Sequence, residues 1–276
     1  MMRSNSGMTV LVLGSLLMGL AGCAEPVQLS TSLTQKQASL RALAAPADFY
    51  NAAKGKVGKD LLAALVGIVK NHKDLGYNGA RNVMFGSLDD YQNNDQIECV
   101  YTGRVAPHVN NTGSASSAKF NTEHSWPQSL GAVGPAKADL HHLFPTDIDT
   151  NGARSSYPFG EVKSVTQSFP QFEVDEGTSA LGNDAQGNKV FEPRSVHKGN
   201  LARAILYFYT CYGANGPANL KNFHIERNVL MTWNKLDPVD DAERTRNDRV
   251  YDAQGNRNPY VDHPEFFDAI GDFPVR

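Results

Sequence analysis

Cysteine is scarce in this sequence: only Cys23, Cys99 and Cys211 occur among its 276 residues. Neither Cys99 nor Cys211 has the local spacing of a zinc site or of a redox motif, which excludes both kinds of site there. With Cys23 set aside, these two remain as an even pair that could form a disulfide in an oxidising compartment. Two buried free thiols are the alternative, because sequence cannot show that the two Cα atoms approach closely enough.

An excess of positive charge is also absent. The 26 Lys and Arg residues and 29 Asp and Glu residues give a formal net charge of −3 at pH 7. Removing residues 1–22, whose only charged residue is Arg3, changes this to −4 (−3 minus +1). A protein that binds nucleic acid by counterion release is expected to have a basic surface, so the composition argues against tight binding. Such a surface could still form if these residues gathered on one face: Arg194, Lys198, Arg203, Arg244, Arg246 and Arg249.

Long apolar runs are missing apart from Met8–Leu20, which is too short and too near the start for a typical membrane-spanning helix. Residues 1–22 are therefore predicted to be a signal peptide. The segment Leu20–Cys23 (Leu-Ala-Gly-Cys) resembles a bacterial lipobox, which implies cleavage before Cys23 and attachment of lipid to its sulfur. Several acyl chains would anchor the protein stably in the cell envelope, at the outer membrane or on the periplasmic or extracellular face. A plain secretory signal followed by an accidental cysteine is the alternative.

No internal repeat or long low-complexity tract divides the remaining chain. Residues 23–46 are rich in Ser, Thr, Gln and Ala and are interpreted as a flexible tether, which leaves residues 47–276 as one folded domain. Residue patterns predict helices at Lys59–Asn71, Lys198–Tyr209, Leu220–Leu236 and Asp240–Val250. Short strands are predicted at Asp95–Gly103 and Gln171–Val174. This mixture indicates the α+β class, with helices around a small sheet.

One short window, Thr122–Glu161, concentrates polar and titratable side chains. Two runs within it, Glu123–Pro127 and Asp139–Pro145, are predicted to be short strands separated by glycine and proline turns. A short helix is expected to open at Asp149–Asn151, where such side chains cap backbone N–H groups. Strand, loop, strand and helix in this order would bring an acid, an imidazole and an amide to one point.

Glu123, His124 and Asn151 supply those three groups, and together they fit metal-assisted hydrolysis of a phosphodiester. A neutral His124 could take a proton from water, because the ordinary histidine pKa lies close to working pH. The oxygens of Glu123 and Asn151 are hard ligands suited to Mg²⁺, with Ca²⁺ or Mn²⁺ as alternatives. Taken singly the signals are weak, because Glu-His pairs are common and an Asn at a helix start is usually only a cap.

Three motifs follow one another in this window: Thr-Glu-His-Ser-Trp-Pro, then Asp-Leu-His-His-Leu-Phe-Pro-Thr-Asp, then Asn-Gly-Ala-Arg-Ser-Ser-Tyr-Pro-Phe-Gly-Glu. In this order they resemble the core of the endonuclease I family, which are secreted or periplasmic bacterial nucleases of the ββα-metal (His-Me finger) class. Further segments in the family's order are Tyr101–Arg104, Phe191–Arg194, Lys198–Arg203 and Gln254–Tyr260. The resemblance implies a fold built around the ββα motif, His124 as general base, and Glu123 and Asn151 as metal ligands. It also implies DNA, often RNA too, as a substrate that is cut with little sequence preference.

One family feature has no counterpart here. Some members place an arginine in a longer insertion between the two strands, where it steadies the cleaved phosphate, whereas this connection holds only Lys137. Arg154, Arg194 or Lys137 could take that role, and Arg154 ranks first because it lies one helical turn after Asn151. The resemblance also favours Arg203 near the scissile phosphate; without it, a solvated helix face is the simpler interpretation.

Two functional hypotheses follow. The first is a lipid-anchored, non-specific, divalent-metal-dependent endonuclease that acts as a monomer. The second is an envelope lipoprotein that keeps the same scaffold for binding nucleic acid and has lost the activity. The presence of Glu123, His124 and Asn151 favours the first, because a decayed site would be expected to lose one of them. A phosphatase acting on small esters would need a closed pocket, which this loop-rich window does not suggest.

Overall fold

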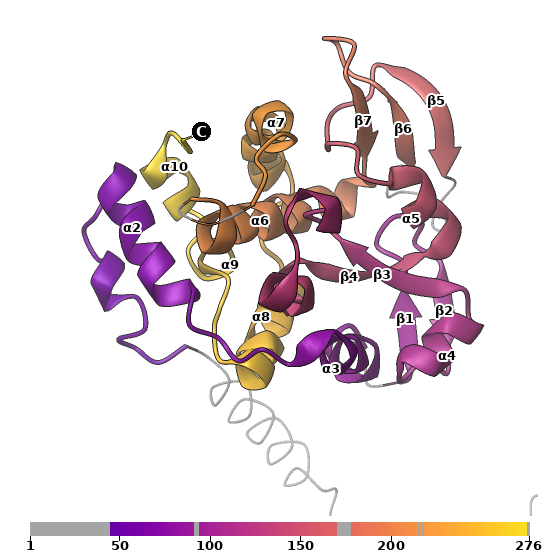
Figure 1. The fold of residues 1–276 in the computed structure, drawn as a ribbon, viewed down its shortest axis with the longest axis horizontal. Helices are drawn as coiled ribbons and strands as arrows, with labels where there is room; N and C mark the ends of the chain where they lie inside the picture. Colours follow the sequence, from indigo (N-terminus) through magenta and orange to yellow (C-terminus); the bar gives the residue numbers. More distant parts are fainter. Residues whose placement is uncertain (1–44, 91–93, 170–177, 215, 217, 275–276) are drawn as a thin grey trace, which may run out of the picture. The chain divides into compact units, whose positions relative to one another are not determined.

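The computed structural model describes residues 45–90, 94–169, 178–214, 216 and 218–274 (Figure 1). The predicted signal peptide, Cys23 and almost all of the predicted tether lie outside the described residues, and so does the strand predicted at Gln171–Val174. Within the described ranges, no helix is both long enough and apolar enough to cross a membrane.

The described strands form three small antiparallel sheets. The first sheet pairs β1 (Gln96–Glu98) with β2 (Val105–Pro107). The second pairs β3 (Phe120–His124) with β4 (Leu143–Asp147), and the third contains β5 (Ser164–Phe169), β6 (Ser179–Asn183) and β7 (Lys189–Glu192). The strand predicted at Asp95–Gly103 is therefore confirmed only over the residues of β1.

The four helices predicted from residue patterns are confirmed to within a few residues, as α2 (Gly58–Val69), α6 (Lys198–Phe208), α7 (Phe223–Leu236) and α8 (Asp241–Gln254). Helices outside those predictions are α3 (Gly76–Val83), α4 (Thr112–Ser117), α9 (Pro259–Asp262) and α10 (Phe266–Ile270). Short helical turns are η1 (Asn51–Ala53), η2 (Met84–Leu88), η3 (Gln128–Leu130), η4 (Gly134–Ala138), η5 (Leu140–His142), η6 (Ser195–His197) and η7 (Tyr209–Gly213). Helices and small sheets together confirm the α+β class.

Helix α6 forms the centre of the core. It packs against α7, α9 and η5 (Figure 1), and every residue from Leu201 to Phe208 is buried. The sequence predicts an apolar stripe of Leu201, Ala204, Ile205 and Phe208 on this helix, and all four residues are buried. The interpretation of Arg203 as part of a solvated face is wrong, because neighbours cover α6 on all sides and the Arg203 side chain is 0% exposed.

Strands β3 and β4 and the following helix α5 (Ile148–Arg154) form the predicted strand, loop, strand and helix unit, with α5 packed on both strands (Figure 1). The strand boundaries differ from the prediction. Strand β3 ends at His124, and β4 begins only at Leu143. The late start of β4 has a clear cause. The Asp139 carboxylate accepts the His141 N–H at 3.1 Å and caps the turn η5, so the residues of η5 cannot extend the strand.

Candidate active site

Glu123, His124 and Asn151 lie around one surface pocket of about 210 Å³. The first two residues end strand β3 and the third belongs to α5, so the ββα unit brings them together. The pocket is lined by Thr122, Glu123, His124, Pro127, Gln128, Ser129, Asn151, Arg154, Ser155 and Ser156.

The hydrogen bonds of His124 define its tautomer. Its Nε2 lies 3.1 Å from the Lys137 carbonyl oxygen, and because a carbonyl can only accept, Nε2 carries the proton. Nδ1 is then the basic nitrogen, and its only neighbour at hydrogen-bond distance in the described part of the chain is Gln128 Nε2 at 3.4 Å. Burial, and next the ring of His142, lower the pKa of His124 to about 3. The imidazole is therefore neutral at physiological pH and can accept a proton.

Neighbouring groups support the His124 ring from behind. The His142 ring centroid lies 5.5 Å from that of His124, and His142 Nε2 donates to the Ala136 carbonyl oxygen at 2.7 Å. His142 therefore packs behind His124 and does not line the pocket. The carbonyls of Lys137 and Ala136 could not have been found in the sequence, because every residue carries a carbonyl group.

Glu123 is 1% exposed and faces Arg154, which is also 1% exposed. The Arg154 Nε lies 3.3 Å from the Glu123 Oε1, but the contact lacks hydrogen-bond geometry and leaves both atoms without a hydrogen-bond partner. Burial raises the pKa of Glu123, and the positive charge of Arg154 offsets part of that rise. Oε1 is thus a buried acceptor that a cation or a donor could still satisfy.

The Asn151 side chain is held in place through its amide NH2 group. Its Nδ2 donates to Asn121 Oδ1 at 2.8 Å and to the Thr122 carbonyl oxygen at 3.2 Å, which fixes the side-chain orientation. Among the described residues, no group donates to Asn151 Oδ1. The sequence interpretation of Asn151 as a mere helix cap does not hold, because α5 begins three residues earlier.

The donor set suits a hard divalent cation. Glu123 Oε1 and Asn151 Oδ1 are oxygen atoms to which no described residue donates a hydrogen bond, and both residues border the same pocket. Mg²⁺ and similar ions prefer such oxygens and can complete their shells with water or substrate phosphate. The residues present therefore fit the predicted ion.

Arg154, which was predicted to steady the cleaved phosphate, donates hydrogen bonds from two of its three nitrogens, and its Nε has no hydrogen-bond partner. Its guanidinium donates to the carbonyl oxygens of Ser125 at 2.7 Å and Ser155 at 2.9 Å, and it lies 4.3 Å from the Phe159 ring centroid. These contacts join α5 to the end of β3 and position Glu123. A direct contact with phosphate stays a prediction.

The other predicted substrate contacts, Arg194 and Arg203, do not line this pocket. The six basic residues that could have formed a basic face are engaged within the protein: Arg194 with Glu98, Lys198 with Glu161 and Glu192, Arg203 with Glu243, Arg244 with Asp241, Arg246 with Asp89, and Arg249 with the carbonyl oxygens of Ser87, Leu88 and Asp90. These pairings neutralise much of the charge that a nucleic acid could have used.

The possible disulfide does not form, because Cys99 and Cys211 are free thiols.

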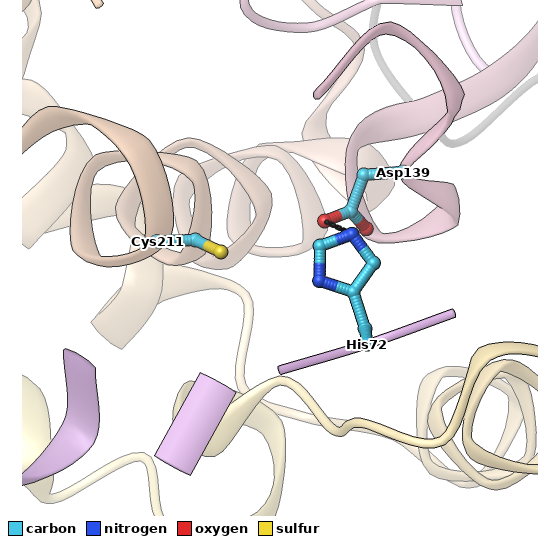
Figure 2. A group of neighbouring side chains, drawn as sticks. All are labelled: His72, Asp139 and Cys211. Atoms are coloured by element: carbon cyan, nitrogen blue, oxygen red, sulfur yellow. Dashed lines mark ion pairs between the residues drawn. The ribbon is translucent and has the colours of Figure 1, made fainter. Parts of the chain in front are cut away.

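A second group of possible metal ligands, His72, Asp139 and Cys211, lies outside the pocket, with the Cys211 side chain directed toward the other two (Figure 2). His72 Nε2 is 3.6 Å from Asp139 Oδ2. The Asp139 carboxylate already accepts hydrogen bonds from the His141 N–H, the Gln254 amide and the hydroxyls of Tyr207 and Tyr212. None of the three residues lines the pocket, and the saturated carboxylate indicates a buried structural network.

Comparison with known proteins decides the family. The model of the endonuclease I family matches residues 57–265, well over half of the chain. The chain belongs to the endonuclease I family. This membership confirms the resemblance seen in the sequence, and it makes the protein an endonuclease. The family also supports the use of a divalent metal ion.

Several relatives of this endonuclease I family member carry nuclease names. An extracellular ribonuclease of Bacillus subtilis (strain 168) is 34% identical over 254 residues, covering 84% of this chain and 83% of the relative. An extracellular ribonuclease of Bacillus amyloliquefaciens is 34% identical, covering 80% and 77%. A periplasmic deoxyribonuclease of Aeromonas hydrophila is 29% identical over 126 residues, 46% of this chain and 48% of that protein.

Proposed function

We propose that this endonuclease is a non-specific, divalent-metal-dependent enzyme that hydrolyses both DNA and RNA. The proposal depends on two features that meet at one pocket. One is a neutral His124 whose Nδ1 can accept a proton, and the other is a pair of hard oxygen atoms that receive no hydrogen bond. Relatives named ribonucleases match most of the chain and relatives named deoxyribonucleases match less than half, which supports including RNA.

In this proposal His124 is the general base. Its Nδ1 takes a proton from the attacking water, while the hydrogen bond from Nε2–H to the Lys137 carbonyl holds the ring and stabilises the positive charge that forms. Glu123 and Asn151 would hold the metal ion, for which Mg²⁺ is proposed because the donors are a carboxylate and an amide oxygen. The ion, when bound, would supply charge stabilisation for the phosphate and the leaving oxygen. Arg154 keeps the Glu123 side chain in place.

We also propose that the protein is exported and anchored in the cell envelope by lipid on Cys23. Support comes from the lipobox-like segment before Cys23 and from relatives named extracellular or periplasmic nucleases. The parent protein should incorporate labelled palmitate in growing cells, and a Cys23→Ser variant should not. Equal labelling of the two proteins, or none in the parent, would contradict the anchor. A monomer is proposed as well.

The nuclease proposal is tested by incubating purified protein with plasmid DNA and with a structured RNA. Mg²⁺ should produce degradation of both substrates, and EDTA should abolish it. His124→Ala should lower the rate by about two to four orders of magnitude, the typical contribution of a general base. His224→Ala, an exposed histidine on α7 outside the pocket, is the matched control and should retain activity. Intact nucleic acid with every divalent ion would favour an inactive binding scaffold instead.

A further inference from the structure

Beside the pocket lies a group of side chains that the proposed mechanism does not use: Tyr77 and Arg81 from α3 and Lys137 from η4, here called the Tyr77 group. The Lys137 Nζ lies 4.4 Å from the Tyr77 ring centroid, and the Arg81 Cζ lies 5.4 Å from it. The Tyr77 ring centroid is 5.5 Å from that of His124. One aromatic ring therefore holds two cations next to the proposed base.

Two hydrogen bonds attach the Tyr77 group to the pocket. Arg81 Nε donates to Thr122 Oγ1 at 3.1 Å, and Thr122 lines the pocket immediately before Glu123. The Lys137 carbonyl is the acceptor that orients His124. The two cations thus come from different elements, and both elements are fixed directly to the site.

The charges of Arg81 and Lys137 are not compensated within the protein. In the described part of the chain no carboxylate forms an ion pair with either residue, and both side chains are partly exposed. They differ in this respect from five of the six basic residues engaged elsewhere, which pair with carboxylates: Arg194, Lys198, Arg203, Arg244 and Arg246. Two positive charges on one ring repel each other, so an anion bound between them would be favoured electrostatically.

We propose that the Tyr77 group is a binding subsite for the nucleic-acid backbone and takes the phosphate next to the one that is cleaved. This inference rests on the proposed function. Arg81 and Lys137 would donate to the phosphate oxygens, and the Tyr77 ring sets their positions. Contacts to phosphate position a strand without reading its bases, which agrees with cleavage of little sequence preference. The subsite would also give an acidic protein the local positive charge that its composition lacks.

Binding is measured first, in the His124→Ala background with EDTA, so that cleavage does not interfere. The probe is a fluorescein-labelled DNA duplex, followed by anisotropy over a series of NaCl concentrations. Arg81→Ala/Lys137→Ala should raise Kd by about tenfold at low salt. It should also reduce the slope of log Kd against log salt by about 1, because about one counterion is released for each neutralised phosphate and the subsite takes one phosphate.

The matched control is Lys54→Ala/Lys59→Ala, which removes the same charge from exposed positions near and in α2. Equal changes of Kd and slope in the two double variants would overturn the subsite, because net charge alone would then explain them. Tyr77→Phe should bind like the parent, and Tyr77→Leu should bind more weakly. If the double alanine variant does not fold, the single variants Arg81→Gln and Lys137→Gln serve, and a parent-like slope in both would overturn the proposal.

A substrate with a single phosphodiester, bis(p-nitrophenyl) phosphate, separates this inference from the proposed function. It has no neighbouring phosphate, so the loss of kcat/KM in Arg81→Ala/Lys137→Ala should be about tenfold greater on DNA, mainly through KM. Equal losses on both substrates would place the cations at the scissile phosphate and overturn the subsite. If the parent enzyme cleaves neither substrate, the proposed function fails, and the binding data still decide on the subsite.

Discussion

Burial acts in opposite directions on the pKa values of two adjacent residues, His124 and Glu123. It lowers the pKa of the imidazole to about 3 and raises the pKa of the carboxyl group. The cause is the same, because a low-dielectric surrounding disfavours whichever form is charged. For His124 the result is a ring that is neutral at physiological pH, with an unprotonated Nδ1. For Glu123 the nearby Arg154 offsets only part of the shift, so the pKa of this predicted metal ligand stays above its ordinary value.

Burial also shifts the pKa of Glu226 on α7, a residue that takes no part in the proposed catalytic mechanism. Burial raises the pKa of this carboxyl group to about 7, although the Phe159 N–H donates to its Oε1 at 2.9 Å. Below the unfolded pKa of about 4.5 both states are protonated. As the pH rises toward 7 the unfolded state loses its proton first, so the free energy of unfolding falls, and above pH 7 the full penalty is present.

Glu226→Gln should therefore remove this pH dependence while keeping the oxygen that accepts the Phe159 N–H. At pH 8 the variant should be more stable than the parent by about 1 to 3 kcal/mol, and at pH 4 the difference should be small. Urea unfolding at the two pH values measures both free energies. A stability difference that is the same at pH 4 and pH 8 would show that Glu226 does not titrate as stated.

At the level of elements, the sequence predicts the helices well and the strands less well. α2 and α7 could be predicted because apolar residues recur at helical spacing, and their ends lie within a few residues of the prediction. The start of β4 could not, because it depends on the Asp139 carboxylate accepting the His141 N–H in competition with strand pairing. For α6 the pattern located the helix and its apolar stripe but could not show that the other faces of the helix are covered as well.

Some residues of the candidate site could likewise be predicted from the sequence, and others could not. Glu123, His124 and Asn151 could be predicted because all three lie within one short window. Of the Tyr77 group, Lys137 was already a candidate for contact with phosphate, but Tyr77 and Arg81 could not be predicted, because α3 lies far upstream and its contact with η4 forms only in the fold. The Lys137 carbonyl, which fixes the His124 tautomer, has no sequence signal at all.

At the scale of the whole molecule, much of the basic charge is used internally. Arg203, Arg246 and Arg257 are each buried and paired with carboxylates. A count of charged residues therefore gives a poor picture of the surface available to a nucleic acid. For Arg203 the sequence had predicted a contact with substrate, and its bonds to Glu243 at 2.7 and 2.6 Å suggest a structural role.

Measurements of stability can distinguish a structural role of Arg203 from a contact with substrate. Arg203→Met leaves the buried Glu243 without its partner and should lower the free energy of unfolding by about 3 to 5 kcal/mol. Arg203→Met/Glu243→Leu should recover most of that loss, because neither charge remains buried. Arg244→Met is the matched control: its partner Asp241 is exposed, so the expected loss is about 0 to 1 kcal/mol. Urea unfolding measures the stabilities, and kcat/KM on DNA is measured where all variants are folded. If Arg203→Met proves as stable as Arg244→Met and yet loses activity on DNA, Arg203 contacts the substrate and the buried ion pair is not its main role.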